Sequence, residues 1–322
     1  MWRGNCRILH RRTFLRDAAL AATAAWTSPS LVRSLAAQQI NDAEAMRAAG
    51  ASAQISTQLL RRKVRVLMGS GGNIAVLPGR DGKLLVDSGF ATSQNQISRA
   101  LGNISDDPVR HLIDTHWHFD HTDGNRWLHN AGATIIGHEN TRIRMSKRRE
   151  IPEFRGIFPP APAEALPTVV FSEEKTLEVN GEKLVLQHYG PAHTDSDILV
   201  HFLDTNLLHT GDTWFNGVYP FIDYRNGGSL DGMIAASTRN LRVVDDQTIV
   251  IPGHGPTGGR AQLAEYDAML HTVRDRVADL KKQGRSARET VAARPTASFD
   301  RKWGGGLVPP DAFVELMHAG IK

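Results

Sequence analysis

Residues 115–121 read Thr-His-Trp-His-Phe-Asp-His and follow an apolar stretch that is typical of a buried β-strand. Three histidines and an aspartate within six residues are hard to explain by packing alone. In an extended segment residues two apart point the same way, so His116 and His118 can bind one metal ion. A turn after them can bring Asp120 and His121 to a second metal ion. Imidazole and carboxylate ligands suit zinc, and iron or manganese also fit.

Three more ligand-type side chains follow other expected strands further along the chain. His193 lies in the sequence Tyr-Gly-Pro-Ala-His-Thr, Asp212 in His-Thr-Gly-Asp-Thr, and His254 in Ile-Pro-Gly-His-Gly. Loops that follow neighbouring strands converge at one end of a sheet, so we expect a single site. The seven candidate metal ligands are His116, His118, Asp120, His121, His193, Asp212 and His254.

In combination, these motifs resemble the metallo-β-lactamase superfamily. The HxHxDH pattern of residues 116–121, the later histidine, the Gly-Asp pair and the Pro-Gly-His-Gly motif occur in the order of that family. The segment Leu-Val-Asp-Ser-Gly at residues 85–89 also matches, and the resemblance extends over residues 64–280. It implies an α/β fold, the αββα sandwich, in which two mixed sheets carry helices on their outer faces.

By resemblance, each candidate residue takes a role at one or both of two zinc ions. His116, His118 and His193 bind the first zinc, Asp120, His121 and His254 bind the second, Asp212 bridges them, and Asp87 braces the metal loops without binding metal. Two divalent cations roughly 3.5–4 Å apart lower the pKa of a bridging water, so that hydroxide is available at neutral pH. That hydroxide attacks a carbonyl polarised by the first zinc, while the second stabilises the leaving atom. Asp120 also orients the nucleophile, which makes it the catalytic residue of this interpretation.

Two blocks of short strands, each followed by helices, agree with two sheets packed face to face. Strands are expected at residues 64–68, 73–77, 83–86, 109–114 and 134–136, and in a second block at residues 169–171, 183–188, 198–202, 207–208 and 248–251. Helices are expected at residues 125–130, 139–149, 230–243 and 262–282, with a proline-rich loop over residues 151–168. We therefore assign residues 63–322 to one metallo-β-lactamase-like domain, preceded by a polar, helix-prone extension at residues 37–62.

Residues 1–36 are typical of an export signal. The stretch His-Arg-Arg-Thr-Phe-Leu-Arg at residues 10–16 precedes a short apolar run around residues 18–26, and small residues at 34–36 suit a signal peptidase. The apolar run is too short for a permanent membrane anchor, which needs about 20 residues. The arginine pair followed by Phe-Leu resembles a twin-arginine (Tat) signal, which implies recognition by the Tat export machinery and a periplasmic or secreted bacterial protein.

The excess of basic charge lies in this leader. The chain has 38 basic and 34 acidic residues, and residues 1–36 hold six of the arginines and one of the acids. The remaining 32 basic and 33 acidic residues give a formal charge of −1, which argues against a nucleic-acid partner. Cys6, the only cysteine, also lies in the leader, so we expect neither a disulfide nor a thiolate ligand in the mature protein.

The motifs specify the substrate less closely than the site. Two subclasses of true metallo-β-lactamase carry a cysteine at the second metal, whereas this chain carries Asp212 at that point. Asp212 resembles the bridging aspartate of glyoxalase II-like thioesterases and lactonases. Export favours a β-lactam, because β-lactams meet their targets in the periplasm. We expect a small-molecule substrate whose amide or ester bond, including that of a β-lactam, is hydrolysed.

Three alternatives remain beside this interpretation. The first is a lactonase or thioesterase-type ester hydrolase on the same site. The second is an iron-dependent sulfur dioxygenase, which bound iron in place of zinc would reveal. The third is a non-catalytic metal-binding protein, which the complete set of seven ligands disfavours.

The segment after the Gly-Asp motif is expected to line the active-site cleft. Two interpretations of its side chains stay open: either Tyr219, Phe221 and Tyr224 form an apolar wall and Asn226 meets a carbonyl or carboxylate of the substrate, or the loop packs for stability. Trp117 and Phe119, which alternate with the first ligands, are expected to pack beneath the site. The eight other histidines outside the leader are interpreted as structural or solvent-facing.

Overall fold

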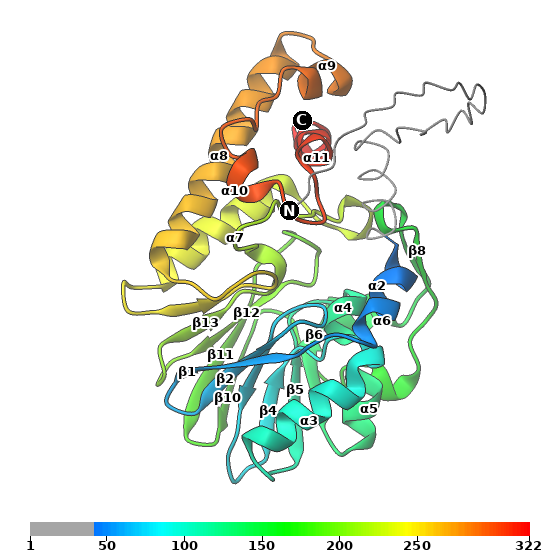
Figure 1. Ribbon diagram of the computed structural model, residues 1–322, viewed down its shortest axis with the longest axis vertical. Helices are drawn as coiled ribbons and strands as arrows, with labels where there is room; N and C mark the ends of the chain where they lie inside the picture. Colours follow the sequence, from blue (N-terminus) through cyan, green and yellow to red (C-terminus); the bar gives the residue numbers. More distant parts are fainter. Residues whose placement is uncertain (1–41) are drawn as a thin grey trace, which may run out of the picture.

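Two β-sheets packed face to face form the centre of the molecule, and helices cover the outer face of each sheet (Figure 1). The computed structural model describes residues 42–322. The expected αββα sandwich is thereby confirmed. The predicted leader, with its arginine pair and Cys6, lies outside the described residues, as does the beginning of the predicted extension.

The strands form a seven-stranded sheet, a five-stranded sheet and a two-stranded hairpin. In the order of the sheet, the first contains β1 (Ser56–Arg61), β2 (Val64–Met68), β3 (Ile74–Leu77), β4 (Lys83–Val86), β5 (Val109–Asp114), β6 (Thr134–His138) and β9 (Val169–Phe171). The second contains β10 (Glu174–Val179), β11 (Glu182–His188), β12 (Ile198–Phe202), β13 (Leu207–His209) and β14 (Ile249–Ile251). The hairpin consists of β7 (Arg149–Ile151) and β8 (Gly156–Phe158).

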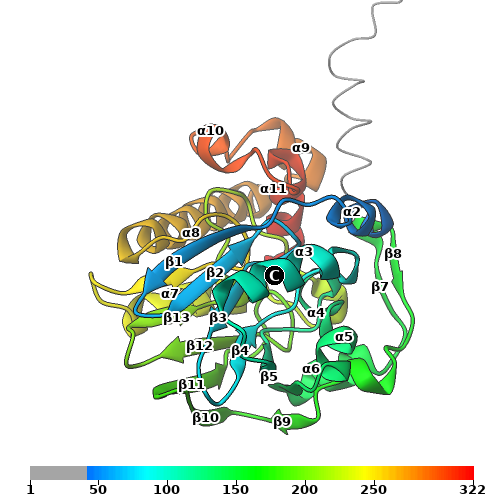
Figure 2. The same cartoon turned by 60° about the horizontal axis from the view of Figure 1, so that its bottom comes forward.

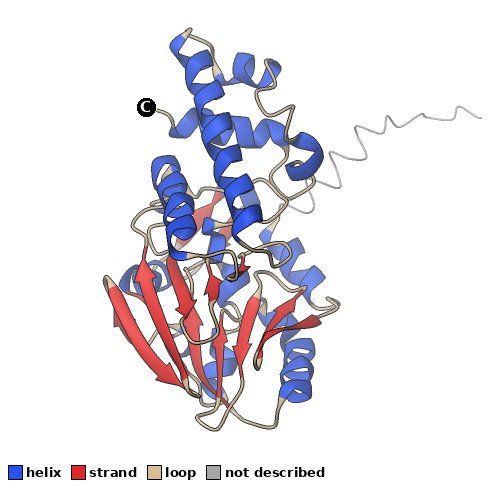
Figure 3. Ribbon diagram, turned by 90° about the vertical axis from the view of Figure 1, so that its left-hand side faces the viewer, coloured by secondary structure: helices blue, strands red, loops and turns tan. Residues whose placement is uncertain are grey.

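Helices lie between and outside these strands. They are α2 (Ala43–Gly50), α3 (Gln94–Ile104), α4 (Phe119–Thr122), α5 (Asn125–Asn130), α6 (Glu139–Met145), α7 (Leu230–Val243), α8 (Arg260–Lys282), α9 (Ala287–Ala292), α10 (Asp300–Trp303) and α11 (Pro310–Gly320). Apolar residues of α3 and α5 cover the first sheet, and those of α7 and α8 cover the second. Figure 3 shows the strands as one layered block with the long helix α8 rising beyond it.

The alternation of side chains along the strands divides the core into layers. In β4, Leu84 and Val86 point between the two sheets, whereas Leu85 packs with the helices outside. Val200 of β12 meets the first pair from the opposite sheet, and Leu128 of α5 meets Leu85 from outside. Because both faces of these strands are buried, they read as continuous apolar runs, which is why the sequence pattern located them.

Three expectations about the helices and strands were wrong. Residues 169–171 do not begin the second sheet, because β9 pairs in parallel with β6 at the edge of the first. The helix expected over 139–149 ends at Met145, and β7 begins inside the segment that we expected to be helix and loop. The extension that we expected to be helix-prone contains helix α2, but its residues 56–61 form the edge strand β1, which pairs with β2.

Helices α9, α10 and α11 gather at one end of the molecule, beyond the sandwich, beside the far part of the long helix α8 (Figure 1). Trp303 of α10 and Phe313 of α11 are buried in the same apolar core as α7 and α8. Figure 2 shows α2 beside the hairpin β7–β8, on the same side of the molecule as α4. Within residues 42–322, no helix combines the length and the apolar character that crossing a membrane requires.

Candidate metal centre

All seven predicted ligands lie at one end of the sandwich, beyond the carboxyl ends of four strands. His116 and His118 follow β5, and the turn that we expected after them is the single-turn helix α4, which carries Asp120 and His121. The other three ligands follow β11, β13 and β14. These three strands run in the same direction, because β12 is antiparallel to both β11 and β13 and β14 is parallel to β13. Their following loops therefore meet at one edge.

The first group of ligand atoms comes from His116, His118 and His193. Their nitrogens lie within 4.8 Å of one another, and all three side chains are buried. Nδ1 of His118 lies 2.8 Å from Nε2 of His193. Nε2 of His116 is buried and has no hydrogen-bond partner among the described residues. An unpaired buried nitrogen is costly, and a metal ion bound by all three nitrogens would satisfy it.

The second group comes from Asp120, His121 and His254. Nε2 of His254 lies 3.1 Å from Oδ2 of Asp120 and 3.3 Å from Nε2 of His121. The same carboxylate oxygen lies 3.6 Å from Nε2 of His121. The geometry again suits one cation held by two imidazoles and one carboxylate.

Asp212 lies between the two groups. Its Oδ2 is 3.4 Å from Nε2 of His193 in the first group and 3.4 Å from Nε2 of His254 in the second. Its Oδ1 is 3.2 Å from Nε2 of His121. One carboxylate therefore reaches both groups, which is the position that a bridging ligand needs.

The hydrogen bonds of the outward nitrogens of three site histidines leave the inward nitrogens able to bind a metal ion. Three rings donate an outward N–H to a protein oxygen: His118 Nε2 to Asp223 at 3.0 Å, His193 Nδ1 to the carbonyl of Phe221 at 2.8 Å, and His121 Nδ1 to Asp87 at 2.7 Å. In a neutral ring this leaves a lone pair on the inward nitrogen. The facing lone pairs of His118 and His193 repel each other unless a cation lies between them. The donor set therefore fits bound metal.

Asp87 holds the metal loop in place without joining the ligand groups. Its carboxylate accepts hydrogen bonds from the backbone N–H and the hydroxyl of Thr115, each at 2.8 Å, in addition to the ring of His121. Asp87 has a φ of +67°, a backbone conformation that a non-glycine residue seldom adopts and that strained functional sites often contain. Its bracing contacts are those that the resemblance implies.

The two groups differ in charge. Burial alone lowers the pKa of His254, but the carboxylates of Asp212 and Asp120 raise it to about 10. Burial raises the pKa of Asp120, yet His121 and His254 outweigh it and lower the value to about 2. Burial lowers the pKa of His193 to about 4. Burial raises the pKa of Asp212 as well, but interaction with nearby histidines, chiefly His254, holds it well below its usual range. Both carboxylates are therefore ionised at neutral pH and attract positive charge, while the first group offers a neutral imidazole.

Two glycines leave room for the ligands. A Cβ atom on Gly253, the residue before His254, would lie 1.8 Å from Oδ1 of Asp212. A Cβ atom on Gly72 would lie 2.1 Å from Cε1 of His121. Backbone therefore approaches the ligands so closely at these positions that only glycine fits.

A cavity of ≈ 240 Å³ opens onto both ligand groups. Most of its wall is apolar and comes from Met46, Phe119, Phe154, Phe215, Val218, Tyr219, Phe221, Leu307 and Val308. Tyr219 and Phe221 thus line the cavity as expected. Among the described residues that line it, none is lysine or arginine.

Two of the predicted cavity residues lie elsewhere. The hydroxyl of Tyr224 donates to the carbonyl of Leu316 at 2.9 Å, and the ring does not line the cavity. The amide of Asn226 is buried and donates to Asp223 at 2.8 Å and to the carbonyl of Glu150 at 3.1 Å. Both predictions were wrong, because the chain turns away from the cavity in the 3₁₀ turn Tyr224–Asn226.

Several residues that shape the site lie outside the recognisable motifs of the sequence. Asp223, which accepts the hydrogen bond from His118, belongs to none of the motifs quoted above, and only its position shortly after the Gly-Asp motif hints at a role. Leu307 and Val308 reach the cavity from the distant segment before α11. Phe119, which we expected to pack beneath the site, lines the cavity, whereas Trp117 is buried as expected.

Comparison with known proteins gives consistent matches. The family model described as "Metallo-beta-lactamase superfamily" matches residues 67–254. A hydroxyacylglutathione hydrolase of Rhodospirillum rubrum is 26% identical over 188 residues, which are 58% of this chain and 64% of that protein. An acyl-coenzyme A thioesterase of Bos taurus is 23% identical over 217 residues, which are 61% of this chain and 77% of that protein. A solved metallo-beta-lactamase from Pontibacter korlensis superposes with a TM-score of 0.55 at 19% identity, covers 68% of this chain and 99% of its own, and supports the fold.

Proposed function

The chain belongs to the metallo-β-lactamase superfamily, whose members are mostly hydrolases, and from this membership and the site we propose a function. The protein is a dizinc hydrolase that cleaves an ester or amide bond beside an apolar acyl group. The observation that carries this proposal is the mainly apolar cavity that opens onto two groups of metal-ligand side chains. The matched relatives named as a hydrolase and a thioesterase support cleavage of an acyl bond.

The protein side chains divide the work of the reaction. Two zinc ions, when bound, supply Lewis acidity and an activated water. Asp120 lines the cavity and stays ionised, since its pKa is about 2, so its carboxylate can accept a hydrogen bond from the attacking water and orient it. Phe119, Phe215 and Phe221 hold the apolar part of the substrate and exclude bulk water.

The lining of the cavity favours a neutral acyl substrate over a β-lactam. A β-lactam antibiotic carries a carboxylate, and such a group is bound tightly where an arginine or lysine meets it. The described lining residues include neither. We therefore propose a neutral ester as the substrate class and keep the cephalosporin as the discriminating probe.

Hydrolysis of p-nitrophenyl octanoate and of a chromogenic cephalosporin by the zinc-loaded protein tests this proposal. We expect faster turnover of the ester, loss of more than about 100-fold in Asp120→Asn, and no loss in Asp279→Asn, an exposed aspartate of α8. Ester turnover that survives both the Asp120 substitution and a chelator would contradict the proposal. Faster turnover of the cephalosporin would favour the β-lactamase interpretation, and bound iron with oxygen consumption would favour the dioxygenase.

We also propose that the Tat machinery exports this protein to the periplasm, on the basis of the leader sequence. The arginine pair Arg11 and Arg12, followed by Phe-Leu, carries this proposal. In a bacterial host we expect the full-length chain to appear in the periplasm without its leader. The double substitution Arg11→Lys and Arg12→Lys should leave it uncleaved in the cytoplasm. Unchanged export of that variant would contradict the proposal.

A further inference from the structure

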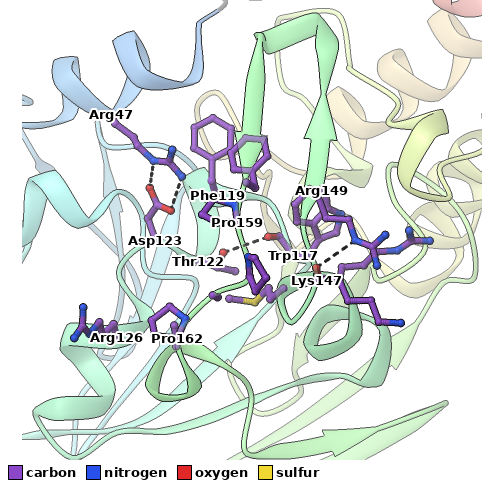
Figure 4. A pocket seen from close by; sticks show the side chains of 16 residues that line it. Arg47, Trp117, Phe119, Thr122, Asp123, Arg126, Lys147, Arg149, Pro159 and Pro162 are labelled. Atoms are coloured by element: carbon purple, nitrogen blue, oxygen red, sulfur yellow. Dashed lines mark hydrogen bonds and ion pairs between the residues drawn. The ribbon is translucent and has the colours of Figure 1, made fainter.

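A second cavity, of ≈ 290 Å³, lies on the other side of Phe119 from the metal centre. Its apolar surface comes from Trp117, Phe119, Met145 and Phe158, together with the proline-rich segment 159–162 (Figure 4). The rings of Phe119 and Phe158 pack with their centroids 5.0 Å apart, and the Arg47 guanidinium lies 4.9 Å from the centroid of Phe119. Of these three groups, Phe119 lines both cavities and therefore separates them.

The second cavity differs from the first in charge. Among the described residues that line it, five side chains are cationic, namely Arg47, Arg126, Arg144, Lys147 and Arg149, against the single carboxylate of Asp123. Figure 4 shows Arg126 on the side of α5, with Lys147 and Arg149 on the opposite side. An anion in the cavity would therefore lie between positive groups.

Two of the five cations already have carboxylate partners. The Nε atom of Arg47 lies 2.6 Å from Asp123, and its Nη1 lies 2.8 Å from Glu44. The guanidinium of Arg144 binds Asp195 through two nitrogens. These pairs occupy Asp123, the only carboxylate among the described lining residues, and two carboxylates outside the lining, Glu44 and Asp195.

The other three cations lack such partners. Within the described part of the chain, no carboxylate lies within 4.0 Å of the charged nitrogens of Arg126, Lys147 or Arg149. Arg149 is half-buried, and its Nε donates only to the carbonyl of Arg144 at 3.3 Å. Burial lowers the pKa of Arg149 and the neighbouring charge of Arg144 lowers it further, and these effects outweigh the more distant carboxylates of Asp195 and Asp223, which raise it. Charges of one sign at a partly enclosed apolar surface raise the local concentration of a counter-ion.

We propose that this second cavity is a binding site for a small organic anion with an apolar body, such as a medium-chain alkyl sulfonate or carboxylate. Its apolar part would lie on Trp117 and Phe158, and its anionic group would meet Arg149 and Lys147. The site needs no metal and is separate from the proposed substrate cavity, whose lining within residues 42–322 contains no lysine or arginine.

A ligand bound in the second cavity would restrict the motion of the metal centre through the peptide backbone. Trp117 and Phe119 alternate with His116, His118 and Asp120 in one short segment. Both aromatic residues line the second cavity, and Phe119 also lines the first. A ligand packed against them would therefore restrict the segment that carries three predicted metal ligands.

Calorimetric titration of the purified protein with 1-octanesulfonate tests the proposal, because sulfonate oxygens are weak ligands for zinc. The triple variant Arg126→Gln, Lys147→Gln and Arg149→Gln should bind it about tenfold more weakly, which corresponds to about 1.4 kcal/mol. The variant Ala161→Phe should also weaken binding, because it fills the cavity without changing its charge. The matched control is Arg110→Gln, which replaces an exposed arginine near the start of β5, at the end of the strand opposite to the metal centre.

The same titration with 1-octanol separates the charge from the alkyl chain. We expect 1-octanol to bind the wild type less tightly than 1-octanesulfonate does. We expect the triple substitution to leave the affinity for 1-octanol unchanged. Equal affinity of wild type, triple variant and Ala161→Phe for the sulfonate would overturn the proposal. Equal affinity of the sulfonate and the alcohol for the wild type would overturn it as well.

Discussion

Replacing Asp223 by alanine should weaken metal binding by the group His116, His118 and His193, although Asp223 is not a predicted ligand. Its buried carboxylate accepts hydrogen bonds from Nε2 of His118 at 3.0 Å and from the amide of Asn226 at 2.8 Å. Without this acceptor the ring of His118 can place its proton on Nδ1, the atom that faces His193. A protonated Nδ1 cannot bind a metal ion, so the substitution acts through the tautomer.

The expected losses of zinc affinity and of folding stability follow from the hydrogen bonds that Asp223 accepts. Loss of a partner that orients a metal-binding histidine typically lowers metal affinity by about 10–100-fold, or about 1.4–2.8 kcal/mol. The substitution also leaves the buried amide of Asn226 with one acceptor fewer, at a cost of about 1–3 kcal/mol in the free energy of unfolding. Asp223→Asn retains one oxygen that can accept from His118, so its zinc affinity should fall between those of the wild type and Asp223→Ala.

Titration of the metal-free protein with zinc, in the presence of a competing chromogenic chelator, measures this effect. We expect one of two binding constants to weaken and the other to change little, with an unchanged circular dichroism spectrum. Asp300→Asn is the matched control, because Asp300 accepts a hydrogen bond from the cavity residue Tyr219 at 3.0 Å and contacts no predicted ligand. If folded Asp223→Ala binds zinc as tightly as the wild type, the tautomer argument is refuted.

Three other predictions follow from the same structure. In Gly253→Ala, the new methyl group would displace the carboxylate of Asp212, so equilibrium dialysis should show weaker binding of both metal ions; full binding of two ions would contradict this. Removing the metal with a chelator should lower the Tm by about 5–10 °C, since a ligand at 100 times its Kd adds about 2.7 kcal/mol, and calorimetry with zinc restored is the control. Phe313→Ala removes a buried ring stacked on Tyr219 at 4.4 Å and should cost about 3–5 kcal/mol in urea unfolding, whereas a change below about 1 kcal/mol would show that α11 does not support the cavity.

The sequence predicted the central strands because local pattern and burial agree there. The predicted bounds of four strands agree with the structure, namely β2, β4, β5 and β12. Most residues of β2 and β4 are apolar and buried, so the ends of these strands are marked by the change to polar or glycine-rich sequence. β1 was missed because most of its residues are exposed at the edge of the sheet, so it shows no apolar alternation. β9 was assigned to the wrong sheet, because three residues carry no information about which neighbour they pair with.

The predicted ligands meet at one site because each lies within a short, distinctive motif after a strand. Tyr224 and Asn226 were predicted from their nearness to such a motif, and this nearness failed where the chain turns away. Leu307 and Val308 reach the cavity through packing of α8 to α11, a contact between segments far apart in the sequence. Such contacts depend on tertiary structure and leave no local pattern to read.

The most direct test of this account is a crystal structure of the purified protein with anomalous diffraction recorded at the zinc edge. We predict two peaks, one among His116, His118 and His193 and the other among Asp120, His121 and His254, with Asp212 reaching both. A fully zinc-loaded, hydrolytically active protein that shows one peak, or peaks away from these residues, would contradict the two-metal centre.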